Sequence, residues 1–320
     1  MGIGRRSLAS WMSLGVGANA REAARRLREM TASPLYRDFV SSAEIDAQYN
    51  VGATLADAGT YLRGYADRSR EARARLRCKL DIAYGPTLDE TLDIFPADRP
   101  GAPVFVFIHG GYWRGFSSKD FSCVALGVQA AGITTVVVNY SLCPKVTIDE
   151  IARQSRAAVA WTLRRIGDHG GDPARVAVGG HSAGGHLSAM CLEARWDEDY
   201  GLARDPLVAA VLVSGIFDLE PLRHSYLQPS IRLDDGVIAR NSPLFAIRPC
   251  ATTLLVTWGG DESAEFARQS TSFHDAWQAA GNASELLSQP GAHHFSATDG
   301  FESAASPICH WLGDRLVATR

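Results

Sequence analysis

The feature that most constrains the fold is a succession of short apolar runs separated by segments of helical character. The apolar runs cover residues 104–108, 134–138, 176–178, 208–213 and 254–257, with a weaker sixth run at 285–287. Continuous runs of this kind indicate strands that are buried on both faces. The helical segments cover residues 119–131, 148–165, 186–195, 265–280 and 302–317. Strands that alternate with helices predict an α/β fold, with a mostly parallel central sheet covered by helices on both faces.

Two further runs precede this pattern and alternate apolar with polar residues. They are Leu80–Tyr84 and Thr91–Phe95, with a turn-rich Gly85-Pro86-Thr87 after the first of them. Such a pair predicts an antiparallel hairpin at the edge of the sheet. Residues 31–80 show no strand alternation and indicate helices that pack on, or partly cover, the later domain. We therefore divide the chain into an N-terminal helical extension, residues 1–77, and a larger domain, residues 78–320.

The net charge and the cysteines of the chain indicate which kinds of partner and which cellular compartment to expect. The 320 residues carry a net charge of −3 without a block of one sign, so we expect neither nucleic acid nor a membrane surface as a partner. The six cysteines are scattered without a C-x-x-C spacing, which is typical of free thiols in a reducing compartment. No apolar run approaches the roughly 18 to 20 residues that span a bilayer. We expect a cytoplasmic protein that binds a small-molecule substrate, and a homodimer is allowed.

The N-terminus leaves a second localisation open. Arg5 and Arg6 precede the apolar stretch 8–16, and residues 18–20 read Ala-Asn-Ala, which resembles a cleavage site. This pattern is compatible with a twin-arginine-like export signal. The alternative is an extension that leads into a helix over residues 21–30.

Gly180-x-Ser182-x-Gly184 lies directly between a predicted strand and a predicted helix. This is the setting of a nucleophile elbow, in which a strained turn lifts a serine hydroxyl above the top of a sheet. The flanking glycines are required there because a side chain would collide with the neighbouring strand and helix. The alternative is an ordinary glycine-rich turn between a strand and a helix.

A second glycine turn follows the first central strand. Its residues are His109-Gly110-Gly111-Tyr112-Trp113, and His-Gly-Gly is a form that lipases and esterases use to bind an oxyanion. The predicted donors are N–H groups of the turn from Gly110 to Tyr112, Gly111 and Tyr112 foremost, together with the N–H of Ala183. The alternative is a simple glycine turn.

A base and an acid are expected at the ends of later strands. His293 and His294 follow the last strand and precede the final helix, where either could reach the serine. Asp261 and Glu262 follow the strand at 254–257, and Asp218 is a third candidate acid. No metal-ligand spacing such as His-Glu-x-x-His is present, so we expect neither a metal nor another cofactor. Residues 221–241 form a long ambiguous segment of the kind that often shapes a pocket.

Longer motifs give a specific resemblance. The chain resembles the kynurenine formamidases (arylformamidases), an α/β-hydrolase family, and their bacterial esterase relatives. The matching segments are Tyr84-Gly85, Leu92–Phe95, His109–Trp113, Tyr140–Lys145, Gly180–Leu187, Val213–Leu222, Arg240–Pro243, Glu265–Ser270 and His294-Phe295. Together they extend over most of residues 78–300. The resemblance implies the α/β-hydrolase fold and a serine hydrolase that acts on an aryl formamide such as N-formylkynurenine.

The resemblance also implies roles for individual residues. Ser182 matches the family nucleophile, and His294, directly before Phe295, matches the family histidine better than His293 does. The family acid precedes a Ser-x-Glu-Phe block, which places Glu262 in that position rather than Asp261. Animal members have aspartate there, so this chain departs from the family, and Asp261 stays the alternative acid.

The substrate expectations are less specific. Trp113 and Phe217 are predicted as aromatic walls for an aryl substrate, and Arg114 is a candidate for binding an amino-acid carboxylate. A short-chain carboxylesterase unrelated to tryptophan breakdown is the alternative function. A hydrolase fold retained as a non-catalytic binding protein is the alternative of another class.

Overall fold

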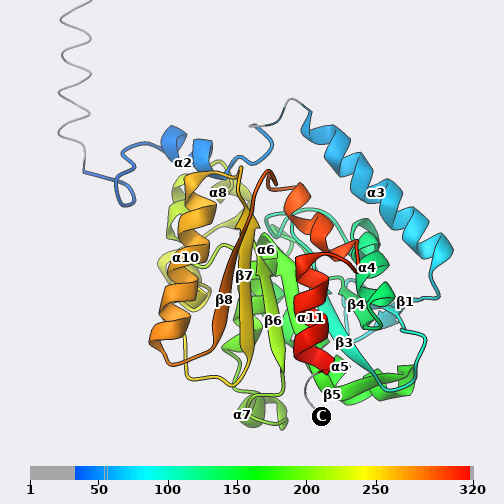
Figure 1. Cartoon of the computed structure of the whole chain (residues 1–320). Helices are drawn as coiled ribbons and strands as arrows, with labels where there is room; N and C mark the ends of the chain where they lie inside the picture. Colours follow the sequence, from blue (N-terminus) through cyan, green and yellow to red (C-terminus); the bar gives the residue numbers. More distant parts are fainter. Residues whose placement is uncertain (1–32, 54, 56, 318–320) are drawn as a thin grey trace, which may run out of the picture.

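A computed structural model describes residues 33–53, 55 and 57–317, and its centre is an eight-stranded sheet (Figure 1). The strands are β1 (Lys79–Ala83), β2 (Thr91–Phe95), β3 (Ala102–Ile108), β4 (Thr134–Val138), β5 (Gly171–His181), β6 (Ala209–Val213), β7 (Thr253–Gly259) and β8 (Ser284–Gln289). Their order is β1-β2-β4-β3-β5-β6-β7-β8. Strand β2 is antiparallel to β1 and β4, and the remaining neighbours are parallel. The predicted mostly parallel sheet and its antiparallel edge hairpin are confirmed.

Helices cover both faces of the sheet, as predicted. The helices after β1 that pack on the strands of the sheet are α4 (Ala125–Ala130), α5 (Ile148–Arg165), α6 (Ala183–Leu192), α10 (Ala264–Ala279) and α11 (Pro307–Val317). Strand β3 shows why its apolar run is continuous. Val104, Val106 and Ile108 belong to a core shared with α5, α6 and α10, whereas Phe105 and Phe107 belong to a second core shared with α4 and α11. Alternate side chains of a strand point to opposite faces, so both sets must be apolar.

The predicted helix over 119–131 is wrong in its first half. Two 3₁₀ turns, Ser118–Asp120 and Ser122–Val124, precede α4. The reason is tertiary: the Ser69 hydroxyl donates to the Asp120 carbonyl at 2.7 Å and accepts the Cys123 N–H at 3.1 Å. The hydroxyl of Ser69, which lies in the helix Ala58–Arg75, therefore replaces hydrogen bonds that a regular α-helix would form between its own backbone groups. The last helix also begins later than predicted, at Pro307, because proline suits a first helical turn.

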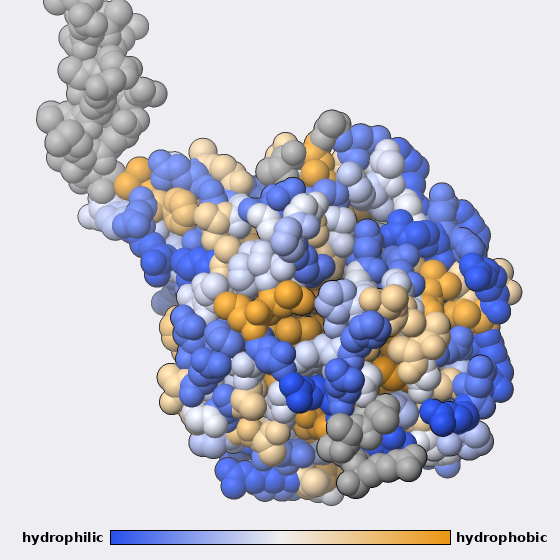
Figure 2. Space-filling view, viewed as in Figure 1, coloured by the Kyte–Doolittle hydropathy of each residue, from blue (hydrophilic) through white to orange (hydrophobic). Residues whose placement is uncertain are grey.

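Two helices precede the sheet, α2 (Ser42–Tyr49) and α3 (Ala58–Arg75). Both begin at side chains that accept an N–H of the first turn, Ser41 for α2 and Asp57 for α3. Figure 1 shows α3 crossing the upper edge of the molecule on the side of α4, and Figure 2 shows a largely hydrophilic surface over it. The predicted helix at 21–30 and the signal-like residues 1–20 lie outside the described residues.

The short elements α7 (Trp196–Tyr200), α8 (Gln228–Ile231) and α9 (Asp235–Arg240) complete the described part of the chain, with 3₁₀ turns between them. All six cysteines are free thiols. Among the described residues, no helix is both long enough and apolar enough to cross a membrane.

Candidate active site

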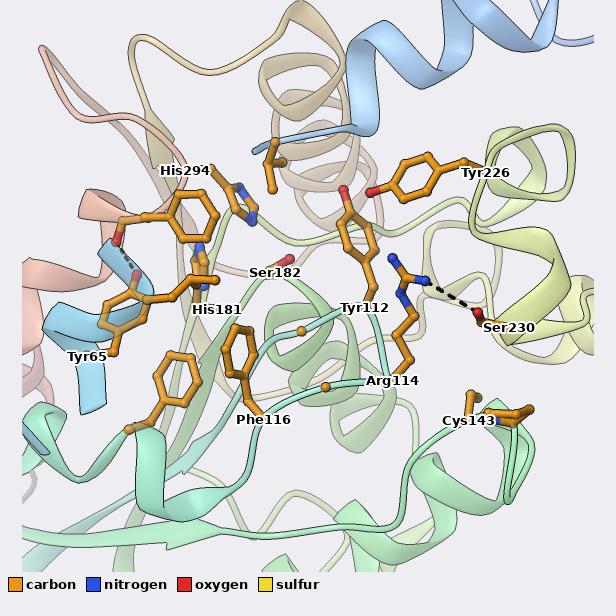
Figure 3. A pocket seen from close by; sticks show the side chains of 17 residues that line it. Tyr65, Tyr112, Arg114, Phe116, Cys143, His181, Ser182, Tyr226, Ser230 and His294 are labelled. Carbon is orange, nitrogen blue, oxygen red and sulfur yellow. Dashed lines mark hydrogen bonds between the residues drawn. The ribbon is translucent and has the colours of Figure 1, made fainter. Parts of the chain in front are cut away.

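A pocket of about 480 Å³ opens beside Ser182, which directly follows β5 (Figure 3). It lies where ligands bind in open α/β sheets, at the carboxyl ends of the strands. The lining residues are Val51, Leu62, Tyr65, Gly111, Tyr112, Arg114, Gly115, Phe116, Phe121, Cys143, Pro144, His181, Ser182, Tyr226, Ser230, His294 and Phe295. The pocket therefore combines the candidate nucleophile and base with mostly apolar walls.

Ser182 has the backbone of a strained turn. Its φ of 57° and ψ of −120° lie in a region that side-chain-bearing residues rarely occupy. The surroundings hold it there, because its N–H donates to the Val213 carbonyl at 2.8 Å and its carbonyl accepts the His186 N–H at 3.1 Å. The glycines are required by close approach: a Cβ on Gly180 or Gly184 would lie 2.4 Å or 1.9 Å from the Ile108 carbonyl oxygen. The predicted strand–turn–helix setting is present.

Glu262 and His294 are in direct contact. His294 Nδ1 and Glu262 Oε2 are 2.6 Å apart, and the two side chains are only 7% and 1% exposed. The second Glu262 oxygen, Oε1, accepts the hydroxyl of Ser214 and the N–H of Gly259. A bond through Nδ1 fixes the ring orientation and leaves Nε2 available to a substrate. His294 and Ser182 line the same pocket (Figure 3), although no hydrogen bond joins these two described side chains.

The structure does not bring the other candidate acids to His294. Asp261 is exposed, and its side chain makes no hydrogen bond with the described residues. Asp218 accepts the Tyr36 hydroxyl at 2.7 Å and the Glu220 N–H at 3.0 Å.

His293, the alternative base, faces another element. Its ring centroid lies 4.3 Å from that of Tyr61, in an edge-to-face arrangement with α3. Its Nδ1 accepts the N–H of Ser296 at 3.2 Å. Of the two adjacent histidines, His294 is therefore the one that lines the pocket.

The predicted oxyanion turn lies beside the serine. A Cβ on Gly110 would be 3.1 Å from the Ser182 Cβ, and both Gly111 and Tyr112 line the pocket. The backbone N–H groups of Gly111, Tyr112 and Ala183 make no hydrogen bond with any described residue. The N–H of Ala183 opens α6, where the helix dipole also favours negative charge. These three donors are available to a developing oxyanion.

Two of the predicted pocket residues are placed elsewhere, and the prediction for them is wrong. Trp113 and Phe217 are 0% exposed and belong to the hydrophobic core rather than the pocket wall. The Trp113 indole donates to His186 Nδ1 at 3.2 Å, and Phe217 stacks on Phe273 with 4.2 Å between ring centroids. An aromatic residue beside a strand end is as well suited to the core as to a pocket, and the sequence does not distinguish the two.

Further walls come from the segment 221–241, which was expected to shape a pocket, and from α3, which the sequence pattern did not connect with the site. Leu62 and Tyr65 are on α3, and Tyr226 and Ser230 come from the long segment 221–241. The length of that segment was a usable signal for pocket shaping. Nothing in the local sequence of α3 indicates that it reaches the serine.

The other buried histidines near the site are held neutral. Burial lowers the pKa of His109 and that of His186 to about 4. Burial, with a further contribution from the nearby His294, lowers the pKa of His181 well below its usual value. His109, His181 and His186 therefore pack around the turns as neutral side chains.

Among the described residues, no group of three or more His, Cys, Asp or Glu side chains could hold a metal ion.

Comparisons with known proteins show similarity over the part of the chain that contains most of this pocket. A protein-family model described as alpha/beta hydrolase fold matches residues 105–297. A kynurenine formamidase of Danio rerio is 29% identical over 235 residues, which are 71% of this chain and 78% of the relative. The esterase LipQ of Mycobacterium tuberculosis is 29% identical over 259 residues, which are 73% of this chain and 61% of that protein.

A similar crystal structure is that of a candidate thioesterase from Silicibacter sp. TM1040. It superposes with a TM-score of 0.75 at 27% identity, covering 86% of this chain and 99% of that chain. The similarity in three dimensions therefore extends over more of the chain than the two sequence similarities do.

Proposed function

The chain belongs to the alpha/beta hydrolase fold family, and from this premise we propose that it is a serine hydrolase that cleaves an aryl formamide of the N-formylkynurenine type. The observation that carries the proposal is the Glu262–His294 contact of 2.6 Å at the edge of a pocket that also contains Ser182. A nucleophile, a base and a group that orients the base are the three parts that activate a serine.

The proposed reaction proceeds in two halves. The Ser182 hydroxyl oxygen attacks the formyl carbon while His294 Nε2 takes its proton, and Glu262 stabilises the resulting imidazolium. The N–H groups of Gly111, Tyr112 and Ala183 bind the tetrahedral oxyanion. His294 then returns the proton to the departing aryl amine, and a formyl ester of Ser182 remains. Water, deprotonated by His294, attacks this ester, and formate and the free serine are released.

Two features support the aryl formamide as substrate. The described aromatic residues Tyr65, Phe116, Phe121 and Phe295 line the pocket, and apolar aromatic surfaces suit an aryl group. The Danio rerio relative, which matches 71% of this chain, is itself a kynurenine formamidase.

A short-chain carboxylesterase is the second candidate, and a specific comparison favours it. LipQ, which is as similar in identity as the formamidase, is an esterase. The same serine chemistry would cleave an ester, because only the leaving atom differs. Discrimination between the two depends on the part of the substrate that leaves.

A substrate panel tests the proposal. We expect kcat/KM to be higher for N-formylkynurenine than for p-nitrophenyl acetate and butyrate, and the Ser182→Ala variant to lose about 10⁶-fold in kcat. Better turnover of the nitrophenyl esters would favour the carboxylesterase. Near-full activity of Ser182→Ala would overturn the assignment of the nucleophile. An active-site fluorophosphonate that fails to label the wild-type protein would favour a non-catalytic binding protein.

A further inference from the structure

We propose that Arg114, Tyr226 and Ser230 form an anion subsite, and that the substrate carries a carboxylate on the part that leaves as the aryl amine or alcohol. This inference rests on the proposed function, since it concerns the pocket of the same serine. N-formylkynurenine already carries such a carboxylate, so the inference adds the residues that bind it and extends the same requirement to an ester substrate. The three side chains line the pocket on one side of Ser182, together with Tyr112 (Figure 3).

The first argument is the charge of the pocket. Arg114 is the one permanently charged side chain among its 17 lining residues, and none of these described residues is an aspartate or a glutamate. Arg114 also makes no ion pair with a described carboxylate, although the chain as a whole has a net charge of −3. An arginine without an acidic partner beside a reactive serine favours an anionic ligand.

The second argument is that the guanidinium is oriented but not saturated. Arg114 Nη1 donates to the Ser230 hydroxyl at 3.3 Å, and the guanidinium carbon lies 5.5 Å from the centroid of the Tyr226 ring. An arginine has five N–H donors in a planar fork that matches a carboxylate. Ser230 and Tyr226 therefore orient the group while most of its donors stay available to a ligand.

The third argument is that the subsite is fixed relative to the oxyanion turn. The Arg114 N–H donates to the Gly111 carbonyl at 3.0 Å, so the cation belongs to the same tight turn as two of the candidate oxyanion donors. On the other side, the Tyr226 N–H donates to Asp46 Oδ1 at 2.8 Å, which holds this segment against α2. Because Arg114 is fixed relative to this turn, a substrate whose carboxylate binds Arg114 would have its scissile bond held at a defined distance from Ser182.

The arrangement of the remaining walls defines the substrate class. The aromatic side chains of Tyr65 and Phe116 lie on the opposite side of Ser182 from Arg114 (Figure 3), and Phe295 also lines the pocket. A ligand that contacts both the aromatic wall and Arg114 is an aromatic compound with a carboxylate. The bond that is cleaved lies beside its ring or between its ring and its carboxylate. Because a formyl group is small, the carboxylate must belong to the leaving part.

The experiment compares charged and neutral members of matched pairs. One pair is N-formylkynurenine and its carboxamide, and the other is 3-acetoxybenzoate and 3-acetoxybenzamide. We expect the wild-type protein to prefer the carboxylate in kcat/KM by about 10-fold, which corresponds to about 1.4 kcal/mol. Since Arg114 is exposed, this preference should decrease when the ionic strength rises.

Variants assign the preference to Arg114. In Arg114→Gln the ratio of charged to neutral kcat/KM should fall to about one, and in Arg114→Lys an intermediate ratio should remain because the charge is kept without the fork. Arg204→Gln is the matched control, because Arg204 is an exposed arginine that does not line the pocket. It should keep the wild-type ratio.

The outcomes separate this inference from the proposed function. A wild-type ratio near one, or a ratio that Arg114→Gln leaves unchanged, overturns the anion subsite while leaving the serine hydrolase intact. If no pair is hydrolysed, the proposed function fails, and binding still tests the subsite. In that case 3-hydroxybenzoate should bind at least several-fold more tightly than 3-hydroxybenzamide by calorimetry, and Arg114→Gln should remove the difference. Equal binding of the two compounds by the wild-type protein would refute the subsite.

Discussion

Glu262 contacts His294 because the hydrogen bonds to its other oxygen fix the carboxylate. One oxygen accepts from Ser214 and Gly259, and this leaves the second oxygen at 2.6 Å from the imidazole. Glutamate is one methylene longer than aspartate, and these two donors hold its longer side chain in one orientation. The neighbouring Asp261 is exposed and has no comparable support. Asp261 and Glu262 are adjacent in sequence, but only the Glu262 side chain is buried and contacts His294.

Two adjacent substitutions test this at the residue scale. In Glu262→Gln the shape is kept, but the charge that stabilises the imidazolium is lost, so kcat should fall by about 10³- to 10⁴-fold. In Asp261→Asn, the matched control, kcat should stay within about twofold, as is usual for a surface substitution. Steady-state kinetics on the best substrate measures both. A larger loss for Asp261→Asn than for Glu262→Gln would contradict the assignment of the acid.

Helix α6 depends on a glycine for its position. Gly184 lies in its first turn, where a Cβ would be 1.9 Å from the Ile108 carbonyl oxygen and 2.7 Å from that of His109. The helix can therefore begin directly beneath Ser182 and against β3 only if this residue has no side chain. In most helices alanine is the better residue, by roughly 0.5–1 kcal/mol.

At the scale of this element we expect opposite effects for two helical glycines. Gly184→Ala should lower the free energy of unfolding by about 2 kcal/mol or more, because backbone must move. Gly313→Ala in α11 is the control, since a Cβ there meets nothing within 4 Å. It should raise the free energy of unfolding by up to about 1 kcal/mol. Urea unfolding followed by circular dichroism measures both, and a stabilised Gly184→Ala would refute the close-approach argument.

At the scale of the whole molecule, tyrosine hydroxyls connect the N-terminal segment to the larger domain. Tyr36 donates to Asp218, Tyr49 to Glu265 at 2.8 Å, and Tyr65 to the Phe295 carbonyl. Each bond joins residues more than 180 positions apart in sequence. Since Tyr65 also lines the pocket, this segment supplies part of the pocket wall when it packs on the rest of the chain.

Removal of one such hydroxyl should weaken the docking. Tyr49 is fully buried, and its hydroxyl also accepts from Gln269 at 3.1 Å, so Tyr49→Phe should cost about 1–2 kcal/mol of stability. Tyr61→Phe is the control, because Tyr61 is 39% exposed and its hydroxyl has no partner among the described residues. Denaturant unfolding gives the cost, and hydrogen exchange should show faster opening of residues 42–49 in Tyr49→Phe alone. Equal behaviour of the two variants would contradict the anchoring role.

Local patterns were sufficient for the sheet and for the turns at its top. The run Thr134–Val138 consists entirely of β-branched residues, which favour a strand, and the predicted bounds agree with those of β4. Gly180-x-Ser182-x-Gly184 and His109-Gly110-Gly111 were identifiable because their geometry depends on missing side chains, which is a property of the residues themselves.

Choices between neighbouring or distant residues required the tertiary structure. Whether His293 or His294 lines the pocket of Ser182, and whether Asp261 or Glu262 contacts that histidine, depends on one residue of register in the loops that follow β8 and β7. The resemblance favoured His294 and Glu262, and the structure places those two in contact. Trp113 was expected at the pocket and is in the core, while Tyr65 forms a wall from a distant helix. A pocket wall is made by segments far apart in sequence, so its composition is a property of their packing and not of any local pattern.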